Sequence, residues 1–462
     1  MTNRCIKLAL FFVIFLSSHL AANAKSLQAH GLFADNMVLQ RELQLPVFGK
    51  AEPDSNITVS LNGQEISTQS DSNGEWLVKI GPFSAGGPYT LNIKSNDEEL
   101  KYQNVLIGDV WLASGQSNMR ITVEEAKNAK KNIRESINFG NVRFFQVTSQ
   151  PSFIQQDDVI GTGWLESSPK TVPDYSAVAY AFARNIFRSQ GVPIGIIQST
   201  RGASTIQQWM SIDSLLKFPE FDNSKVNNES LTVLYNSLIA PLIPYGIKGI
   251  LWYQGEANIE EPELYKDLFS EFVADLRTEW NQGTFPFLSV QISSYKTNDG
   301  SVISPFRETQ YLSTLEIPSH EMASTIDLGD KDFNIHPKRK DDVGKRLALL
   351  AEELAYNNSS LVNSGPIFKN VEFEDKKIRI TFDNIGKGIK IKASSPKNIR
   401  GFEIAGDGGR FIKAKAKLEK GSIVIKHKFE NITHVRYAWV NAPKPTVFNK
   451  EGFPAIPFNV KL

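Results

Sequence analysis

Hydrophobic and polar positions follow different patterns in successive parts of this 462-residue chain. Residues 26–103 contain short alternating runs, such as NITVSLNG and GEWLVKIG, separated by the turn-forming stretches EPDSN, DSNG and SAGGP. Alternation with a period of two is typical of strands that bury one face. We therefore expect a small antiparallel β-sandwich in this part of the chain.

The pattern changes at about residue 104, where the apolar runs stop alternating. These runs read NVLIGDVWLAS, PIGIIQS, IKGILWYQ, FPFLSVQIS and MASTIDL. Continuous apolar runs of this length are typical of strands buried on both faces. Apolar residues at i, i+3, i+4 and i+7 predict helices over 262–280 and 343–354. Strands alternating with helices predict a parallel sheet that is covered by helices on both faces.

The strand pattern returns from about residue 360, in KKIRITFDN, GSIVIKHKF and THVRYAWVN. A chain of this length is too long for one ordinary core. We therefore predict an N-terminal β-sandwich domain at 25–103, an α/β domain at 104–358 and a C-terminal β-rich domain at 359–462.

The N-terminus has the order of a secretory signal peptide. Arg4 and Lys7 precede an apolar run over residues 8–16, and Ala22-Asn23-Ala24 provides a small-x-small cleavage site. The run is shorter than the roughly 20 residues that a membrane span needs. We expect cleavage to remove residues 1–24 and to leave a soluble chain, secreted or periplasmic, with no membrane partner.

Charge and cysteine content narrow the classes of function. The chain has 51 basic and 50 acidic side chains, for a net charge of +1. Nucleic-acid and membrane-surface partners require a strongly basic field, so this balance argues against both and fits a neutral partner such as a carbohydrate. The single cysteine, Cys5, lies in the signal peptide. The mature chain therefore has no thiol, and any nucleophile must be an oxygen.

Polar residues stand at the predicted carboxyl ends of the middle domain's strands. The stretches concerned are GQSN, STRGAS, WYQGEAN and, after the last strand, DLGDKDFNIHP. Parallel sheets bind ligands beyond the carboxyl ends of their strands, so these stretches are expected to share one rim. The candidate residues that they bring to it are Ser117, Gly202, Gln254, Glu256, Asn258 and His336.

This set of residue types suits attack on an ester. A serine hydroxyl needs a base to take its proton, and histidine is the usual base near neutral pH, which assigns these roles to Ser117 and His336. Charge that develops on the ester carbonyl oxygen is stabilised by fixed donors. The backbone N–H groups of Gly202 and Ser117 and the side-chain amide of Asn258 could provide them.

The other histidines of the mature chain are less suitable as the base. His320 precedes a strand, at the opposite end of the predicted sheet, and the rest lie in the flanking β regions. These are His30, His427 and His434.

Three motifs, GQSNM, WYQGEAN and NIHPKRKDDVGKRLA, occur in an order that resembles the sialate O-acetylesterase family of SGNH hydrolases. LFADNMVLQRELQLPVFGKAEP, AGGPYTL and RYAWVNAPKPTVFNKEGFPAIPF extend the resemblance over nearly the whole mature chain. The resemblance implies an α/β fold, with an SGNH-type, flavodoxin-like three-layer domain around a parallel sheet and β-sandwich-like regions on both sides. It also implies Ser117 as nucleophile, His336 as base, and Gly202 and Asn258 as oxyanion donors.

One position departs from the family pattern. SGNH enzymes commonly place an aspartate three residues before the histidine, where this chain has Phe333. The group that orients the His336 ring is therefore open among three possibilities. Asn334 could orient it through its amide oxygen. Asp332 or Asp330 could fold back to do so, or a backbone carbonyl could hold the ring of a Ser-His dyad.

Several candidates are interpreted as supporting residues. Gln254 is expected to form hydrogen bonds beneath the site, and Glu256 to pair with an arginine such as Arg201 or Arg307. Arg307, on an expected helix, is interpreted as structural.

The sequence thus predicts a carbohydrate O-acetylesterase that forms an acyl-enzyme and uses no metal or organic cofactor. An acetyl xylan or pectin esterase with the same mechanism is an alternative. A glycoside hydrolase that uses Glu256 with a second carboxylate is another. A carbohydrate-binding protein that has lost catalysis is the third.

Overall fold

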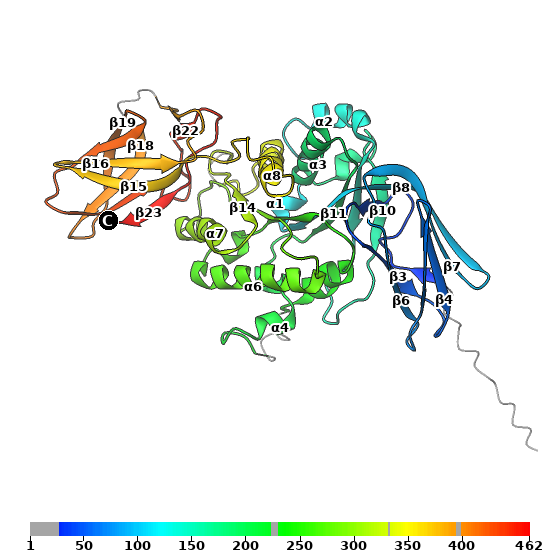
Figure 1. The fold of residues 1–462 in the computed structure, drawn as a ribbon. Helices are drawn as coiled ribbons and strands as arrows, with labels where there is room; N and C mark the ends of the chain where they lie inside the picture. The colour runs from blue at the N-terminus through cyan, green and yellow to red at the C-terminus, as the bar shows by residue number, and fades with distance from the viewer. Residues whose placement is uncertain (1–26, 223–229, 331–332, 394–398) are drawn as a thin grey trace, which may run out of the picture.

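The computed structural model describes residues 27–222, 230–330, 333–393 and 399–462. The signal peptide predicted at 1–24 and the candidate Asp332 lie outside these ranges. A mixed α/β region occupies the middle of the molecule, and β-rich regions lie on either side of it (Figure 1). In the part of the chain that the structure describes, no helix has both the length and the apolar character needed to cross a membrane.

Antiparallel pairs form most of the N-terminal region, as the alternating pattern predicts, whereas residues 38–40 pair in parallel with residues 106–108. Buried positions alternate with more exposed ones along β4 (Asn56–Leu61) and β6 (Glu75–Ile80). The buried ones, among them Val59 and Val78, belong to the same hydrophobic core. The other strands are β1 (Gln28–Ala29), β2 (Val38–Gln40), β3 (Leu45–Lys50), β5 (Gln64–Gln69) and β7 (Gly86–Ser95).

A single long strand, β8 (Glu98–Gly115), continues from this region into the middle sheet. Its first half pairs antiparallel with β7, up to Ile107. From Asp109 to Gly115 it pairs in parallel with β11 (Ile194–Thr200). The N-terminal region and the middle sheet therefore share one continuous piece of backbone.

The middle sheet has the strand order β10-β9-β11-β8-β12-β13-β14. All neighbouring pairs are parallel except β10 with β9, which confirms the predicted parallel sheet. The five continuous apolar runs form β8, β11, β12, β13 and β14, whereas β9 and β10 were not predicted. Besides β8 and β11, the sheet contains β9 (Val142–Val147), β10 (Gly161–Glu166), β12 (Gly249–Tyr253), β13 (Phe287–Val290) and β14 (His320–Ala323).

Helices cover both faces of this sheet (Figure 1). Leu251 packs in one core with α3 (Ala177–Gln190) and α8 (Lys340–Leu354). Trp252, the next residue, packs on the opposite face with α6 (Pro262–Trp280). The predicted helices over 262–280 and 343–354 are therefore confirmed. The other α-helices of the described residues are α1 (Ser117–Arg120), α2 (Ala129–Glu135), α4 (Ile212–Leu215) and α7 (Ser304–Glu316).

Short 3₁₀ or π turns complete the middle region. They are η1 (Ser136–Phe139), η2 (Val172–Asp174), η3 (Ile206–Trp209), η4 (Tyr235–Ile239), η5 (Ala240–Leu242) and η6 (Glu256–Asn258).

The C-terminal region is an antiparallel sheet of order β15-β16-β20-β19-β18-β21-β23, with β17 and β22 paired beside it. It has its own core, and buried Arg307 of α7 links it to the middle region by donating hydrogen bonds to the backbone oxygens of Val440 and Asn441. The strands are β15 (Ile367–Glu374), β16 (Lys377–Asp383), β17 (Ile389–Ile391), β18 (Ile399–Gly406), β19 (Ile412–Glu419), β20 (Ser422–Lys426), β21 (Ile432–Tyr437), β22 (Val447–Asn449) and β23 (Phe458–Lys461).

Candidate active site

A tight turn at the carboxyl end of β8 presents Ser117. Gly115 has a φ of +123°, and a β-carbon there would lie 2.3 Å from the backbone oxygen of Tyr253. Only glycine fits this close approach without strain. The backbone N–H of Gln116 then donates to the same oxygen at 2.9 Å, and α1 begins at Ser117. The serine is thus held at the carboxyl end of the sheet, half-buried.

His336, in the segment between β14 and α8, faces this serine. Its Nε2 lies 2.8 Å from the Oγ of Ser117, within the range needed for proton transfer. Partial burial and the positive charge of Lys340 lower the pKa of the imidazole, and the carboxylate of Glu125 opposes them. A lowered pKa favours the neutral ring, which is the form that can accept a proton from the hydroxyl.

Gly202 lies beside the same serine, in the loop after β11. A β-carbon built on Gly202 would be 3.8 Å from the Cβ of Ser117. The neighbouring Arg201 donates its backbone N–H to the oxygen of Gly115 at 3.0 Å, which ties the loop to the serine turn. The structure therefore brings three of the predicted residues, Ser117, Gly202 and His336, together.

Asn258, in η6 after β12, is held by a set of hydrogen bonds. Its Oδ1 accepts from the backbone N–H of Ile206 at 3.0 Å and from Nε2 of Gln254 at 2.7 Å. Its Nδ2 donates to Oε1 of Gln207 at 2.9 Å. An amide Nδ2 carries two hydrogens, so one N–H is free of these contacts and could donate elsewhere. Buried Gln254 also donates to the oxygen of Ser204, linking η6 to the loop that carries Gly202.

Glu256 has a partner different from the one expected. Its Oε1 accepts from Nδ2 of Asn118 at 2.5 Å, and its buried Oε2 has no hydrogen bond from any described residue. The expected pairing with Arg201 or Arg307 is replaced by this contact, although the charge of Arg307 acts on the carboxyl from a longer range. Burial raises the pKa of Glu256.

The residues considered as orienting groups shape the loop around His336. Oδ1 of Asn334 accepts from the backbone N–H of His336 at 3.0 Å, and its Nδ2 donates to Asp330 at 3.3 Å. Asp330 also accepts from the backbone N–H of Lys338 at 2.8 Å. These contacts fix the backbone of the loop, and Asp332 is outside the described residues. The group that orients the imidazole stays a prediction.

Sequence reasoning did not single out Glu125 or Lys340, the charged groups that act on the His336 ring. The sequence does contain a signal for the burial of Lys340. It lies on the same i, i+3, i+7 stripe as the apolar residues Val343 and Leu347, which places it on the buried side of α8.

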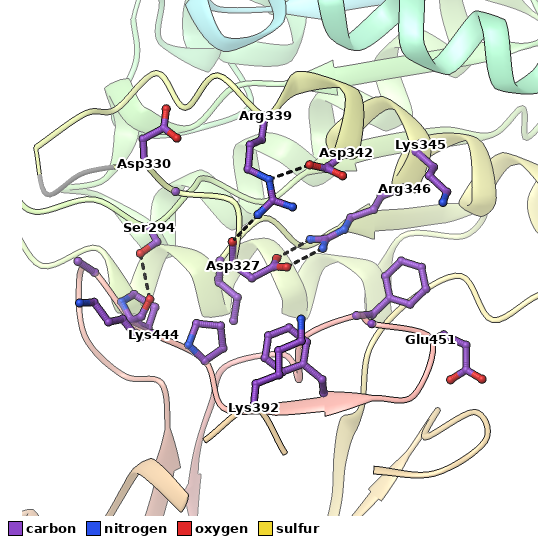
Figure 2. A pocket seen from close by; sticks show the side chains of 18 of the residues that line it. Ser294, Asp327, Asp330, Arg339, Asp342, Lys345, Arg346, Lys392, Lys444 and Glu451 are labelled. Carbon is purple, nitrogen blue, oxygen red and sulfur yellow. Dashed lines mark hydrogen bonds and ion pairs between the residues drawn. The ribbon is translucent and has the colours of Figure 1, made fainter. Parts of the chain in front are cut away.

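A separate cavity of about 520 Å³ lies between the middle and C-terminal regions (Figure 2). Asp327 and Arg346 form a two-point ion pair there, at 2.7 and 2.8 Å. Neither Ser117 nor His336 lines this cavity. Among the described residues, no cluster of three histidine, cysteine or acidic side chains could hold a metal ion.

Comparisons with known proteins show which family the chain is similar to. Residues 107–352 match the family model described as "Carbohydrate esterase, sialic acid-specific acetylesterase". The sialate O-acetylesterase of Homo sapiens is 30% identical over 380 residues, 73% of each chain. That of Mus musculus is 29% identical over 489 residues, 89% of each chain. The crystal structure of a carbohydrate acetylesterase from Xanthomonas citri has a TM-score of 0.86 and 35% identity, covering 94% of this chain and 99% of that one.

Proposed function

Because the chain belongs to the sialic acid-specific acetylesterase family of carbohydrate esterases, we propose that it removes acetyl esters from sugar hydroxyls through Ser117 and His336. The observation that carries this mechanism is the 2.8 Å contact between Nε2 of His336 and Oγ of Ser117 at the carboxyl end of the sheet. The substrate is an O-acetylated carbohydrate, and the names of the curated relatives favour a sialic acid.

The reaction has two halves. In the first, Nε2 of His336 takes the hydroxyl proton while Oγ of Ser117 attacks the acetyl carbonyl carbon. The tetrahedral intermediate collapses, the bond to the sugar oxygen breaks, and the imidazolium returns its proton to that oxygen. In the second, His336 deprotonates a water that attacks the acetyl-serine. Acetate leaves, and the proton returns to Ser117.

The negative oxygen of each intermediate needs donors that are already in place. The backbone N–H groups of Ser117 and Gly202 and the second N–H of Asn258 are the candidates. Their support is the position of Gly202 beside the serine and the hydrogen bonds that fix the Asn258 amide. Removing one such donor typically lowers kcat by about 10²- to 10³-fold.

We extend the proposal to the type of fold in the middle domain and to the domain limits. The parallel sheet with helices on both faces supports an SGNH-type, flavodoxin-like three-layer domain at 104–358. The flanking domain limits at 25–103 and 359–462 stay predictions. Export to the periplasm or the medium rests on the signal-peptide pattern of residues 1–24.

The test compares wild type with Ser117→Ala on p-nitrophenyl acetate and on a panel of O-acetylated glycans. Wild type is expected to release acetate without creating new reducing ends, which separates it from a glycoside hydrolase. Ser117→Ala is expected to lose activity by about 10³-fold or more. Ser289→Ala, which removes a buried serine hydroxyl elsewhere in the sheet, is the matched control and is expected to stay active. Equal rates for wild type and Ser117→Ala would refute the mechanism.

A further inference from the structure

A buried chain of polar side chains adjoins the Ser117 turn and the segment that carries His336. Nζ of Lys340 donates a hydrogen bond to Oδ1 of Asn118. Nδ2 of Asn118 donates to Oε1 of Glu256 at 2.5 Å and to the backbone oxygen of Ile335 at 3.0 Å. Lys340 and Asn118 are both 0% exposed. A single amide thus connects a buried cation, a carboxylate and a backbone carbonyl.

Two members of this chain, Asn118 and Ile335, adjoin residues of the proposed mechanism. Asn118 directly follows Ser117, and Ile335 directly precedes His336. The bond from Asn118 to the oxygen of Ile335 therefore ties the serine turn to the histidine segment, across more than 200 residues of sequence. The amide can make this bond only while its oxygen faces Lys340 and its nitrogen faces Ile335.

A lysine is an unusual choice for this position. Burying an ammonium group is strongly unfavourable unless it is paired, and an apolar side chain of similar size usually fills such a space at lower cost. The ring of Tyr253, 5.1 Å from Nζ, and the oxygen of Asn118 compensate for part of the lost hydration. Packing alone therefore does not account for Lys340.

We propose that Lys340 is a positioning residue for ester hydrolysis. Acting through Asn118, it holds the Ser117 turn and the His336 segment at proton-transfer distance, and in its protonated form its charge disfavours a charged imidazole. This inference rests on the proposed Ser-His mechanism.

The charge acts on the imidazole in a defined direction. The groups that face His336 are Lys340, which lowers its pKa, and Glu125, which raises it. Burial lowers the pKa of Lys340 itself to about 7, against the opposing charges of Glu256 and Asp330. Lys340 is therefore protonated in the acidic range where His336 titrates, and it favours the neutral imidazole there.

The carboxyl of Glu256, which Asn118 connects to Lys340, is itself affected by burial and by nearby charges. Burial raises its pKa, while the hydrogen bond from Asn118 and the charges of Lys340 and Arg307 oppose that shift. Burial and the charge of Glu256 both raise the pKa of Tyr253, so this phenol stays neutral.

The test measures hydrolysis of p-nitrophenyl acetate by Lys340→Met from about pH 5 to about pH 8. We expect kcat to fall by about tenfold or more while KM changes by less than about twofold, because the reacting groups lose alignment and not substrate contacts. The acidic limb of kcat/KM is expected to move to higher pH, since the charge that lowers the imidazole pKa is gone. Lys338→Met, an exposed lysine two residues away, is the matched control and is expected to match wild type in both respects.

A second variant covers the case in which Lys340→Met does not fold, as judged by circular dichroism and thermal melting. Asn118→Asp keeps the shape and an acceptor for Lys340, but it has no N–H for the oxygen of Ile335. It is expected to lower kcat and to move the acidic limb to higher pH, because it adds a negative charge.

A folded Lys340→Met with wild-type kcat, or with a lower kcat and an unmoved acidic limb, would overturn the inference. The same results for Asn118→Asp would do so if Lys340→Met does not fold. If wild type and Ser117→Ala are equally inactive, the failure lies in the proposed function instead.

Discussion

The structure contains two serine–histidine contacts of equal length in very different places. Nε2 of His336 lies 2.8 Å from Oγ of Ser117, and Nε2 of His320 lies 2.8 Å from Oγ of Ser289. The first pair is half-buried at the carboxyl end of the sheet. The second pair lies between β13 and β14, where both residues are buried and the ring of His320 contacts Phe269.

Because the two hydrogen bonds have the same length, length does not distinguish the pair that we propose to be reactive from the buried one. Burial lowers the pKa of His320 to about 4, and its Nδ1 lies 3.4 Å from the oxygen of Ser313. With 3% exposure for His320 and 5% for Ser289, no ester can reach the hydroxyl. The first pair differs from the second in that it lies at the strand ends, where a substrate can reach it. This difference can be tested by substitution.

The largest expected effect separates the two imidazoles by activity. His336→Gln is expected to lower kcat/KM for p-nitrophenyl acetate by about 10³-fold, because the general base is lost. His320→Gln is expected to keep kcat/KM within about threefold at a temperature where it is folded, and to melt at a lower temperature. Comparable losses of activity in the two variants would show that the buried pair takes part in the reaction.

The next effect concerns stability and pH. His320 binds its proton more weakly in the folded chain, with a pKa of about 4 against 6.5 unfolded, so its neutral state stabilises the fold above pH 6.5. As the pH falls from 6.5 to 4, the unfolded chain takes up the proton first, and about 3 kcal/mol of the free energy of unfolding is lost. Urea unfolding at both pH values measures this loss.

Other groups titrate in the same range, so the comparison needs a control. The pH dependence of His320→Gln is expected to be smaller than that of wild type by about that amount, whereas Ser117→Ala is expected to keep the wild-type dependence. Parallel curves for wild type and His320→Gln would rule out a buried neutral imidazole.

The smallest effect is expected at Asn334. Its hydrogen bonds go to the backbone of His336 and to Asp330, so Asn334→Ala removes support for the loop and not a contact to the ring. We expect kcat to fall by less than about tenfold, with the acidic limb unmoved. A loss approaching that of His336→Gln would identify the asparagine as the group that orients the imidazole.

Much of the fold could be predicted because its signals are local. The continuous apolar runs identified β8, β11, β12, β13 and β14, and helical spacing identified α6 and most of α8. The rule that ligands bind at strand ends then placed Ser117, Gly202 and His336 in one neighbourhood, and the structure brings them together.

Features that depend on distant partners could not be predicted in this way. The short runs of β9 and β10 give a weak signal by themselves, and their pairing with each other and with β11 makes them strands. Nothing near Lys340 in the sequence shows that Asn118, more than 200 residues away, would accept a hydrogen bond from it. The predicted partner of Glu256 was wrong for the same reason. Its charge suggested an arginine, whereas the fold brings the amide of Asn118 to it.

The continuous strand β8 limits how this enzyme can be trimmed or recombined. An engineered chain that starts at residue 104 would cut the strand and strip Val105 and Ile107 of their partners in β7, only ten residues ahead of the Gly115 turn. A chimera joined at Gly108 would fall between the last pairing with β7 and the first with β11, but it would also have to keep the parallel pairing of Gly108 with Gln40 of β2. The N-terminal region thus anchors the strand that leads to Ser117, the proposed nucleophile.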